Sequence, residues 1–296
     1  MKNFSIIIPT YKRPAALNKL VRSITNSSIL PAEVIILDDD QLHPSIIREI
    51  ETSLTTFKIN LVYIKKDHEI NPRGSSESRN MGFQIVKEDL AFVFDDDIIL
   101  EKNYLEKVLS VFEKNTDKNL ISAAGRISEE RSISFFEKVF RKIFLMSSKY
   151  AWDVTPWGFP VWDQNYSGDE KQFYVHGGMA CYRVSYVKNN PFGMSFGGGR
   201  DALEDVEFFL RAKKNGKHVY YVSDAVLTHT KDPNGRSSEF EAGKVEGRAL
   251  KEMKRLHVSG IKHRSAFYWS TFGLIIKKIL TGNARAARGI IFELKK

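Results

Sequence analysis

Short apolar runs alternate with segments of helical spacing over the first 115 residues, and this alternation constrains the fold more than any other feature of the chain. The apolar runs are rich in β-branched and aromatic residues, as buried strands are, and they span residues 4–8, 34–37, 59–64 and 90–94. Between the first two runs, Leu17, Leu20 and Ile24 share one helical face. Strands that alternate with helices predict an α/β fold with a mainly parallel central sheet and flanking helices.

Polar clusters stand where three of these strand-like runs end. They are residues 9–13 after the first run, 38–40 after the second and 95–97 after the fourth. Ligands of open parallel sheets bind beyond the carboxyl ends of the strands. The three clusters therefore predict a binding site along one edge of the sheet.

Asp95, Asp96 and Asp97 place three like charges side by side. At neutral pH their repulsion raises the pKa of at least one of them unless a cation or hydrogen-bond donors offset it. Carboxylates suit Mg²⁺ or Mn²⁺, ions usually held by one or two protein groups while substrate phosphates complete the shell. The run therefore predicts a divalent metal together with a diphosphate. Taken alone, it is equally consistent with solvated caps for a helix that starts near Asn103.

Composition limits the domain size of the protein and the cellular compartment in which we expect it. The chain has 296 residues, 42% of them hydrophobic, which suffices for one large globular domain or for a domain with an appendage. The single cysteine, Cys181, forms no internal disulfide, and the first strand-like run starts without a preceding secretory leader. We therefore expect a protein of the cytosol.

Much of the net charge of +9 lies towards the C-terminus, where basic residues surround the apolar run 267–276. The run is shorter than the roughly 20 residues of a membrane-spanning helix. It could lie in the headgroup plane of a membrane, the reading we favour, or form a helix packed on the core. Nucleic acid is the least favoured partner. Aromatic and basic residues over 135–150 predict a core-facing helix, with an interfacial helix as the alternative.

An ordered set of short motifs resembles the family 2 glycosyltransferases, inverting enzymes with a GT-A fold that use nucleoside diphosphate sugars. The motifs of the first half are residues 8–13, 37–39, 71–74, 78–82 and 94–97. Those of the second half are residues 177–178, 204–208 with Arg211, and 222–225 with His229. Each motif is short, but their order and approximate spacing agree over residues 4–230.

The resemblance implies a domain organisation as well as a fold. A Rossmann-like GT-A sandwich is expected over residues 1–235, in which 1–115 bind the nucleotide and 116–235 bind the acceptor. Residues 236–296 then form a basic, helical C-terminal extension that associates with a membrane.

The resemblance places the nucleotide donor on residues of the first half. They are Pro9, Thr10, Tyr11, Arg13, Asp39, Arg79, Asp95 and Asp96. Asp39 can accept a hydrogen bond from an imide N–H, which uracil and thymine carry and cytosine lacks. The neighbouring Asp38 or Asp40 could instead cap a helix. Arg79 stands at an expected helix start, where free N–H groups already favour an anion.

Metal, base and acceptor roles are implied by the same resemblance. Asp97 and His229 become ligands of Mn²⁺ or Mg²⁺, and an imidazole suits Mn²⁺ better. Asp205 becomes the general base, with Glu204 as the competing candidate and a plain helix N-terminal charge as the alternative for both. Acceptor-binding roles fall to Gly178 and Glu204. Five aromatic residues line the acceptor side or belong to the core, and the resemblance fixes none of them individually; they are Trp157, which we assign to acceptor binding, Trp162, Tyr166, His176 and Phe196.

The resulting hypothesis is a metal-dependent, inverting glycosyltransferase of the hexosyltransferase type. It would move a sugar from a nucleoside diphosphate donor, UDP-linked by preference, to a hydroxyl of a glycan or polyprenyl-linked acceptor in cell-envelope polysaccharide biosynthesis. We expect it as a peripheral protein on the cytoplasmic face of the membrane. The alternatives are a nucleotidyltransferase of similar fold and a non-catalytic membrane or nucleic-acid adaptor.

Overall fold

The structure, a computed structural model, describes residues 3–128, 133–163, 166, 168, 170–193, 202–234 and 237–296. Strands and helices alternate through the first 115 residues as the sequence predicts. They are β1 (Ser5–Thr10), α1 (Pro14–Thr25), β2 (Glu33–Asp38), α2 (Pro44–Thr56), β3 (Asn60–Lys65), α3 (Ser75–Ile85), β4 (Leu90–Phe94), β5 (Ile98–Leu100) and α4 (Tyr104–Lys114). All four expected strands and the helix after Asn103 are therefore present.

The strands of the second half differ widely in length, from 2 residues to 12. The elements of this half are β6 (Leu120–Ile127), α5 (Phe135–Ile143), β7 (Asp153–Val154), β8 (Pro160–Val161), β9 (Glu170–Gln172), β10 (Met179–Arg183), α6 (Val184–Asn189), α7 (Glu204–Lys214), β11 (His218–His229), α8 (Glu239–His257), α9 (Ile261–Leu280) and α10 (Ala284–Leu294). The expected helix that begins at Glu204 is α7.

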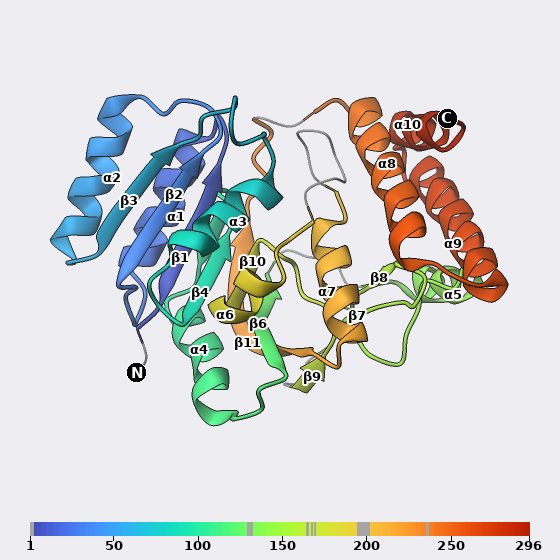
Figure 1. The fold of residues 1–296 in the computed structure, drawn as a ribbon, viewed down its shortest axis with the longest axis horizontal. Coiled ribbons are helices and arrows are strands. Elements are labelled where there is room, and N and C mark those ends of the chain that lie inside the picture. The colour runs from blue at the N-terminus through green and yellow to red at the C-terminus, as the bar shows by residue number, and fades with distance from the viewer. Residues whose placement is uncertain are drawn as a thin grey trace.

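A mixed central sheet joins both halves in the strand order β3-β2-β1-β4-β10-β6-β11-β5, with β9 paired to β11 (Figure 1). The strands β3, β2, β1 and β4 are parallel, whereas β10 runs antiparallel to its neighbours β4 and β6. Thr10 and Asp38 are register partners at the ends of β1 and β2. The carboxyl ends of β1, β2 and β4 thus meet at one edge, as the sequence predicts.

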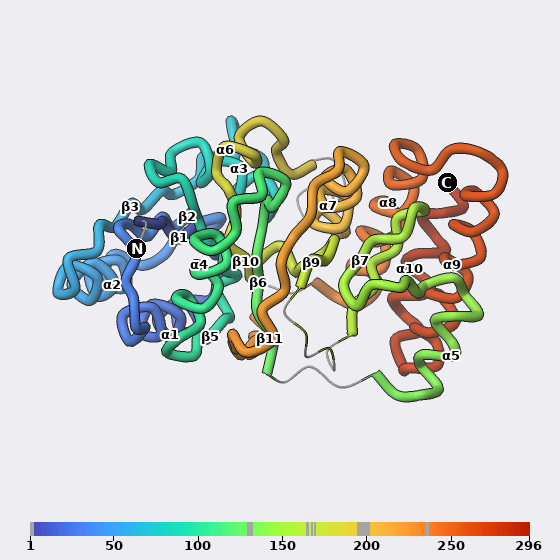
Figure 2. Tube along the Cα trace, turned by 90° about the horizontal axis from the view of Figure 1, so that it is seen from below, coloured from blue at the N-terminus to red at the C-terminus, as the bar shows by residue number. Residues whose placement is uncertain are grey.

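Helices cover both faces of the sheet, and the strand residues alternate between two cores (Figure 2). Ile6 and Ile8 of β1 pack in the same cluster as Leu20 of α1. Ile7, between them, packs with Phe83 of α3. Because successive side chains of a strand point to opposite faces, a strand buried on both sides must be apolar throughout. This explains the unbroken apolar runs.

Helix α5 differs from the core-facing helix that the sequence predicts over 135–150. It ends at Ile143, and Leu145 adopts a left-handed φ of 54° just beyond it. Phe135 and Phe136 are exposed, whereas Arg141 is buried. A hydrophobic pattern fixes which residues share a face but not which face turns towards the core. Here the side of α5 that meets the protein contains Glu137, Phe140 and Arg141, and most of the apolar stripe faces solvent.

The C-terminal helices α8, α9 and α10 stand together at one end of the molecule (Figure 1). Helices α8 and α10 approach closely because Gly289 carries no side chain: a Cβ there would lie 2.3 Å from the backbone oxygen of Phe240. Helix α9 buries Phe267 in the core beside it and exposes Trp269 and Phe272. Among the described residues, no helix is long and apolar enough to cross a membrane.

Glu207 ties α7 to α8. Its carboxylate accepts a hydrogen bond from Arg211 at 3.0 Å and lies 2.9 Å from His257 Nε2. Burial acts to raise the pKa of Glu207, but the bonds from His257 and Arg211 outweigh it and hold the pKa below its ordinary value. The folded state therefore binds this proton more weakly than the unfolded state, and the contact stabilises the fold above the unfolded pKa.

We expect the stabilisation by Glu207 to be lost as the pH falls below the ordinary glutamate pKa of about 4.3. Glu207→Gln should lower the free energy of unfolding by about 1–3 kcal/mol at pH 7 and flatten its dependence on acid pH. Denaturant unfolding between pH 3 and 7 measures both effects. Glu241→Gln is the matched control, because Glu241 forms an exposed pair with Lys244. Equal losses in the two variants would contradict the prediction.

Candidate functional site

Asp96 lies at the centre of the acidic run and is held from three sides. Its Oδ2 accepts a hydrogen bond from Thr10 Oγ1 at 2.8 Å and one from the backbone N–H of Tyr11 at 3.2 Å. Its Oδ1 accepts from Arg13 Nη1 at 2.9 Å. Burial raises the pKa of Asp96 to about 6, although these donors favour the carboxylate. The raised pKa expected in this run is present, and its main cause is burial.

Asp97 meets the long strand β11 at the end of that strand. Its Oδ1 lies 3.1 Å from His229 Nε2, and its Oδ2 lies 3.2 Å from Arg13 Nη1. The backbone N–H of Asp232 donates to Oδ2 at 3.1 Å. The structure thus brings together the two residues that the sequence assigns to a metal.

The pair Asp97 and His229 fits a divalent ion that keeps open positions for a ligand. Two donor atoms 3.1 Å apart match adjacent ligands of an octahedral ion with bonds of about 2.1 Å. Within the described part of the chain, no group of three or more His, Cys, Asp or Glu side chains could hold a metal ion. A carboxylate and an imidazole with few protein ligands favour Mn²⁺ over Ca²⁺.

Asp39 follows β2 and faces a buried lysine that the sequence analysis missed. Lys66 Nζ lies 2.8 Å from Asp39 Oδ1 and donates to the backbone oxygen of Pro72 at 2.9 Å. The backbone N–H of Gly74 donates to Asp39 Oδ2 at 3.2 Å. Lys66 comes directly after β3, so the strand-end rule that found the other polar clusters could have found it as well.

Helix α2 is capped by His43, whose side chain accepts from the backbone N–H of Ser45, so the helix-capping role considered as the alternative is wrong for Asp38. The Asp38 carboxylate accepts from the backbone N–H groups of Asp40 and Leu42, at 2.9 and 2.7 Å. Tyr63 donates its hydroxyl to Asp38 Oδ2 at 2.6 Å. Asp38 therefore fixes the loop after β2, which leaves Asp39 as the carboxylate at the strand end that faces Lys66 and Gly74.

Arg79 links the donor half of the chain to α7. Its Nη1 donates to Glu204 Oε1 at 2.9 Å, and its Nη2 lies 3.3 Å from Asp95 Oδ1. Burial alone would lower the pKa of Arg79, but Glu204 and Asp95 raise it above its ordinary value. Arg79 is thus a buried cation whose charge is balanced by one carboxylate from each half of the site.

Asp205 projects from the first turn of α7. Its Oδ2 accepts a hydrogen bond from the Tyr174 hydroxyl at 3.0 Å and one from the backbone N–H of Gly177 at 3.2 Å. The Asp205 side chain is near Arg79 as well, because a Cβ at Gly177 would lie 2.7 Å from Asp205 Cβ and 3.4 Å from Arg79 Nη1. The structure therefore brings Asp205 into the cluster that contains Asp95.

Gly178 seats Asp95. A Cβ at position 178 would lie 2.2 Å from Asp95 Oδ1, and the backbone N–H of Asp95 donates to the Gly178 oxygen at 2.9 Å. The role of Gly178 that the structure supports is therefore space for Asp95, in addition to the predicted place beside the acceptor.

Gly178→Ala is expected to displace the Asp95 carboxylate from Arg79 and to weaken donor binding at least about tenfold, because 1.4 kcal/mol suffices for that factor. Stability should change little, since the displaced atoms end a side chain that can rotate. Titration calorimetry with a nucleotide sugar measures the affinity. In an Asp95→Ala background the same substitution should have almost no further effect. A full additional loss there would contradict the mechanism.

The predicted aromatic residues do not all reach the carboxylates. Trp157 donates its indole N–H to Leu145 O and to Ser270 Oγ of α9, both at 3.1 Å, so it lies against the C-terminal helices. His176 packs edge-on to Trp152 and lies beside Trp162. Tyr166 packs beside Tyr221. Phe196 falls outside the described residues. Tyr11, by contrast, carries the cation Lys12 5.2 Å above its ring, next to Asp96.

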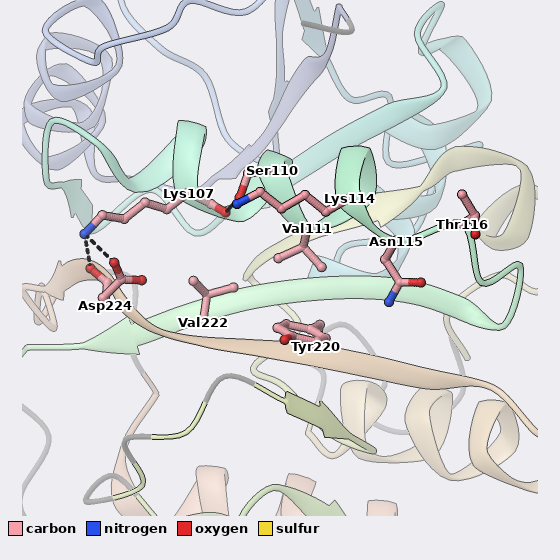
Figure 3. Close-up of a pocket in the computed structure, with 9 residues that line it drawn as sticks. All are labelled: Lys107, Ser110, Val111, Lys114, Asn115, Thr116, Tyr220, Val222 and Asp224. Carbon is pink, nitrogen blue, oxygen red and sulfur yellow. Dashed lines mark hydrogen bonds and ion pairs between the residues drawn. The ribbon is translucent and has the colours of Figure 1, made fainter.

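A hollow of 540 Å³ lies between α4 and β11, away from the carboxylate cluster (Figure 3). Lys107 reaches across it to Asp224, with its Nζ 3.0 Å from Asp224 Oδ2. None of the predicted catalytic, metal-binding or donor-binding residues lines it. The candidate active site is therefore the cluster at the carboxyl edge of β1, β2 and β4.

A mainly parallel sheet with this carboxylate cluster at its edge defines the GT-A class of α/β proteins. The chain belongs to glycosyltransferase family 2: its residues 2–249 match the sequence model described as "Glycosyltransferase like family 2". The predicted family and fold class are confirmed, and the family is one of glycosyltransferases. The match runs past residue 235, and the boundary expected there stays a prediction.

Several curated relatives are glycosyltransferases by name. An uncharacterized glycosyltransferase of Haemophilus influenzae is 33% identical over 117 residues, which are 40% of this chain and 37% of that protein. The GalNAc(5)-diNAcBac-PP-undecaprenol beta-1,3-glucosyltransferase of Campylobacter jejuni is 24% identical over 221 residues, 66% of this chain and 69% of its own. The chain thus spans about a third of the first relative and about two thirds of the second.

Solved structures share the fold. A mannosyltransferase from Pyrobaculum calidifontis in complex with GDP-Man and Mn²⁺ gives a TM-score of 0.62 at 14% identity, over 97% of this chain and 74% of that one. S. aureus TarS 1–349 in complex with UDP-GlcNAc gives 0.55 at 15% identity, over 94% and 73%. At these identities the likeness concerns the fold.

Proposed function

We propose that the protein is a metal-dependent, inverting glycosyltransferase that moves a sugar from a UDP-linked donor to an acceptor hydroxyl. The observation that carries the proposal is the double contact of Arg79 with Asp95 and Glu204. It holds the first turn of α7, and therefore Asp205, against the acidic run that would hold the donor diphosphate. A transferase needs this proximity, because the base must act where the leaving group departs.

The uracil preference rests on Asp39. Lys66 and the N–H of Gly74 each engage one of its oxygens, yet a carboxylate offers about four acceptor positions. Capacity remains for the imide N–H of uracil. The UDP-GlcNAc complex of TarS supports this choice, whereas the mannosyltransferase neighbour was solved with GDP-Man.

Asp97 and His229 are the residues that would hold the metal. When bound, a divalent ion neutralises charge that develops on the leaving diphosphate. Arg13 is fixed between Asp96 and Asp97 and adds a cation at the same place. Exposed Lys12 lies over the half-buried ring of Tyr11 and can face the nucleotide phosphates. The donor is thereby oriented by cations on one side of its diphosphate.

Asp205 is the proposed base. Tyr174 and the N–H of Gly177 fix one oxygen of its carboxylate, and the N–H of Val206 donates to the other at 2.8 Å. As the acceptor oxygen bonds to the anomeric carbon, its proton passes to Asp205 and the bond to the nucleoside diphosphate breaks. Attack opposite the leaving group inverts the anomeric configuration.

The acceptor is proposed to be a glycan or a polyprenyl-linked sugar. The name of the Campylobacter relative includes an undecaprenol-linked substrate, and TarS is named a poly(ribitol-phosphate) beta-N-acetylglucosaminyltransferase. With such an acceptor the protein would work at the cytoplasmic face of a membrane, and this location is part of the proposal. In this scheme residues 236–296 are the extension that brings it there.

A thermal-shift screen of UDP-, dTDP- and GDP-sugars, with and without Mn²⁺, tests the donor. A ligand at 100 times its Kd stabilises the native state by about 2.7 kcal/mol. We expect the largest rise in melting temperature with UDP-sugars and Mn²⁺. In Asp39→Ala the preference for one nucleobase over the others should be lost. A clear preference for GDP-sugars would overturn the role of Asp39. Release of pyrophosphate instead of nucleoside diphosphate would identify a nucleotidyltransferase.

A further inference from the structure

Helix α5 meets the protein with Glu137, Phe140 and Arg141 and leaves its other apolar side chains exposed to solvent. Phe135 and Phe136 are 75% and 83% exposed, and Val139 and Ile143 continue the same face at helical spacing. Exposed large apolar side chains are ordinary when single, but a row of four on one helix marks an interaction surface.

The polar contacts of α5 fix this orientation. Buried Arg141 donates to the backbone oxygen of Trp162 at 3.0 Å and to Glu137 at 2.9 Å. Glu137 in turn pairs with Lys277 of α9 at 2.7 Å. Turning the phenylalanines inward would break these bonds and leave a buried guanidinium without its partners, which is costly. The outward apolar face is therefore built into the fold.

Helix α9 extends the same surface. Trp269 donates its indole N–H to the backbone oxygen of Ile143 at 2.7 Å, and Phe144 stacks on its ring at 5.1 Å. Phe272 follows on α9, 6.2 Å from Phe144 between ring centroids. Trp269 and Phe272 are themselves about half exposed, at 44% and 51%. The contiguous surface, here called the α5–α9 face, consists of Phe135, Phe136, Val139, Ile143, Trp269 and Phe272.

The charge of the two helices that form the α5–α9 face is mainly positive. Helices α5 and α9 contain seven Lys and Arg residues and a single acid, Glu137, which is paired with Lys277. Lys138 and Lys278 pair with Asp163 and Glu246, which lie outside the two helices. Lys142, Lys262 and Arg264 are exposed. Aromatic residues flanked by exposed cations match the boundary between anionic lipid headgroups and acyl chains. A second copy of this chain matches poorly, because its basic surface would repel this one.

We propose that the α5–α9 face docks on an anionic lipid bilayer, with its aromatic side chains inserted below the headgroups. The inference deepens the proposed function, since it names the surface that would present a lipid-linked acceptor. The base helix lies on the inner side of the same two helices: Leu203, two residues before Asp205, lines an apolar cavity of 160 Å³ together with Leu274 of α9 and buried Arg141 of α5. Docking would therefore place the bilayer against the outer side of the helices that contact the start of the base helix.

Sedimentation with vesicles tests the docking on the full chain. Vesicles of phosphatidylcholine with phosphatidylglycerol should bind the protein more tightly than vesicles of phosphatidylcholine alone, and salt should weaken the binding. Phe135→Ser combined with Phe136→Ser should weaken binding at least about tenfold, because each phenyl group loses its burial. Lys142→Glu combined with Arg264→Glu should remove the preference for phosphatidylglycerol.

Phe57→Ser is the matched control. Phe57 is also exposed, but it follows α2 at the far end of the molecule from α5 (Figure 1). The Phe57→Ser variant should bind vesicles as tightly as the wild type does. Quenching by brominated lipids should reach Trp269, and Trp269→Phe should remove most of that quenching.

Two results would overturn the proposal. One is a wild type that does not bind anionic vesicles. The other is self-association, seen by light scattering, that the two phenylalanine substitutions abolish while vesicle binding persists, since the face would then join copies of the chain. Thermal shifts by nucleotide sugars in the same variants report the donor site separately. A failure of docking is thereby distinguished from a failure of the proposed function.

Discussion

Asp205→Asn is expected to lower sugar transfer by about 10²–10⁴-fold, the usual contribution of a general base. The amide keeps the shape of the side chain and can still accept a hydrogen bond from Tyr174 or Gly177, so the fold should be preserved. It cannot take the proton of the acceptor hydroxyl. Donor binding, measured by calorimetry with a nucleotide sugar and Mn²⁺, should stay near the wild-type value, and initial rates should carry the whole loss.

Glu204→Gln separates the two candidate bases. Glu204 pairs with buried Arg79, so this substitution should lower the melting temperature and weaken donor binding, with a smaller direct loss of turnover. A stable Glu204→Gln variant without turnover, beside an active Asp205→Asn variant, would make Glu204 the base. Wild-type turnover in Asp205→Asn would remove the assignment altogether.

Asp97→Asn is expected to abolish the Mn²⁺-dependent part of donor binding and to lower transfer by about 10³-fold or more, because a bound metal supplies several kcal/mol of charge stabilisation. The Asp97 carboxylate is buried and contacts both Arg13 and His229. Electron paramagnetic resonance of free Mn²⁺ measures the metal affinity without any turnover.

Asp224→Asn is the matched control for Asp97→Asn. Asp224 is an exposed carboxylate that pairs with Lys107 in the hollow between α4 and β11. It should change neither Mn²⁺ affinity nor transfer. His229→Gln should weaken Mn²⁺ binding less than Asp97→Asn, since it removes a neutral ligand. Unchanged Mn²⁺ affinity in Asp97→Asn would contradict the metal site.

The parallel half of the fold was predictable because its signals are local. The runs at 4–8 and 90–94 are apolar throughout, since strands buried on both faces have to be, and each ends in a polar cluster. Strand ends on one side of a parallel sheet lie together, so the grouping of Asp39 with Asp95 followed from the order of elements. Lys66 obeys the same rule and was overlooked because a single lysine after a strand resembles any surface cation.

The contacts across the site were not predictable from spacing. Arg79 and Glu204 are 125 positions apart, and Trp157 and Ser270 are 113 apart. Resemblance to a family could place Asp205 and Asp97 in one active site, but it could not indicate that Arg79 would be buried between two carboxylates. Nor could it show that Trp157 would lie against α9.

The order of strands and helices, the edge of the sheet at which the polar residues gather, and the family follow from the amino-acid sequence. They depend on periodicity and motif order, which are properties of neighbouring residues. The partners of Arg79, the pairing of Asp97 with His229 and the outward direction of α5 emerge only when the chain is folded. Each of these depends on which elements, far apart in the sequence, pack against one another. The free energy of that packing comes from burial and from pairing of distant charges, and a pattern of neighbouring residues does not specify either.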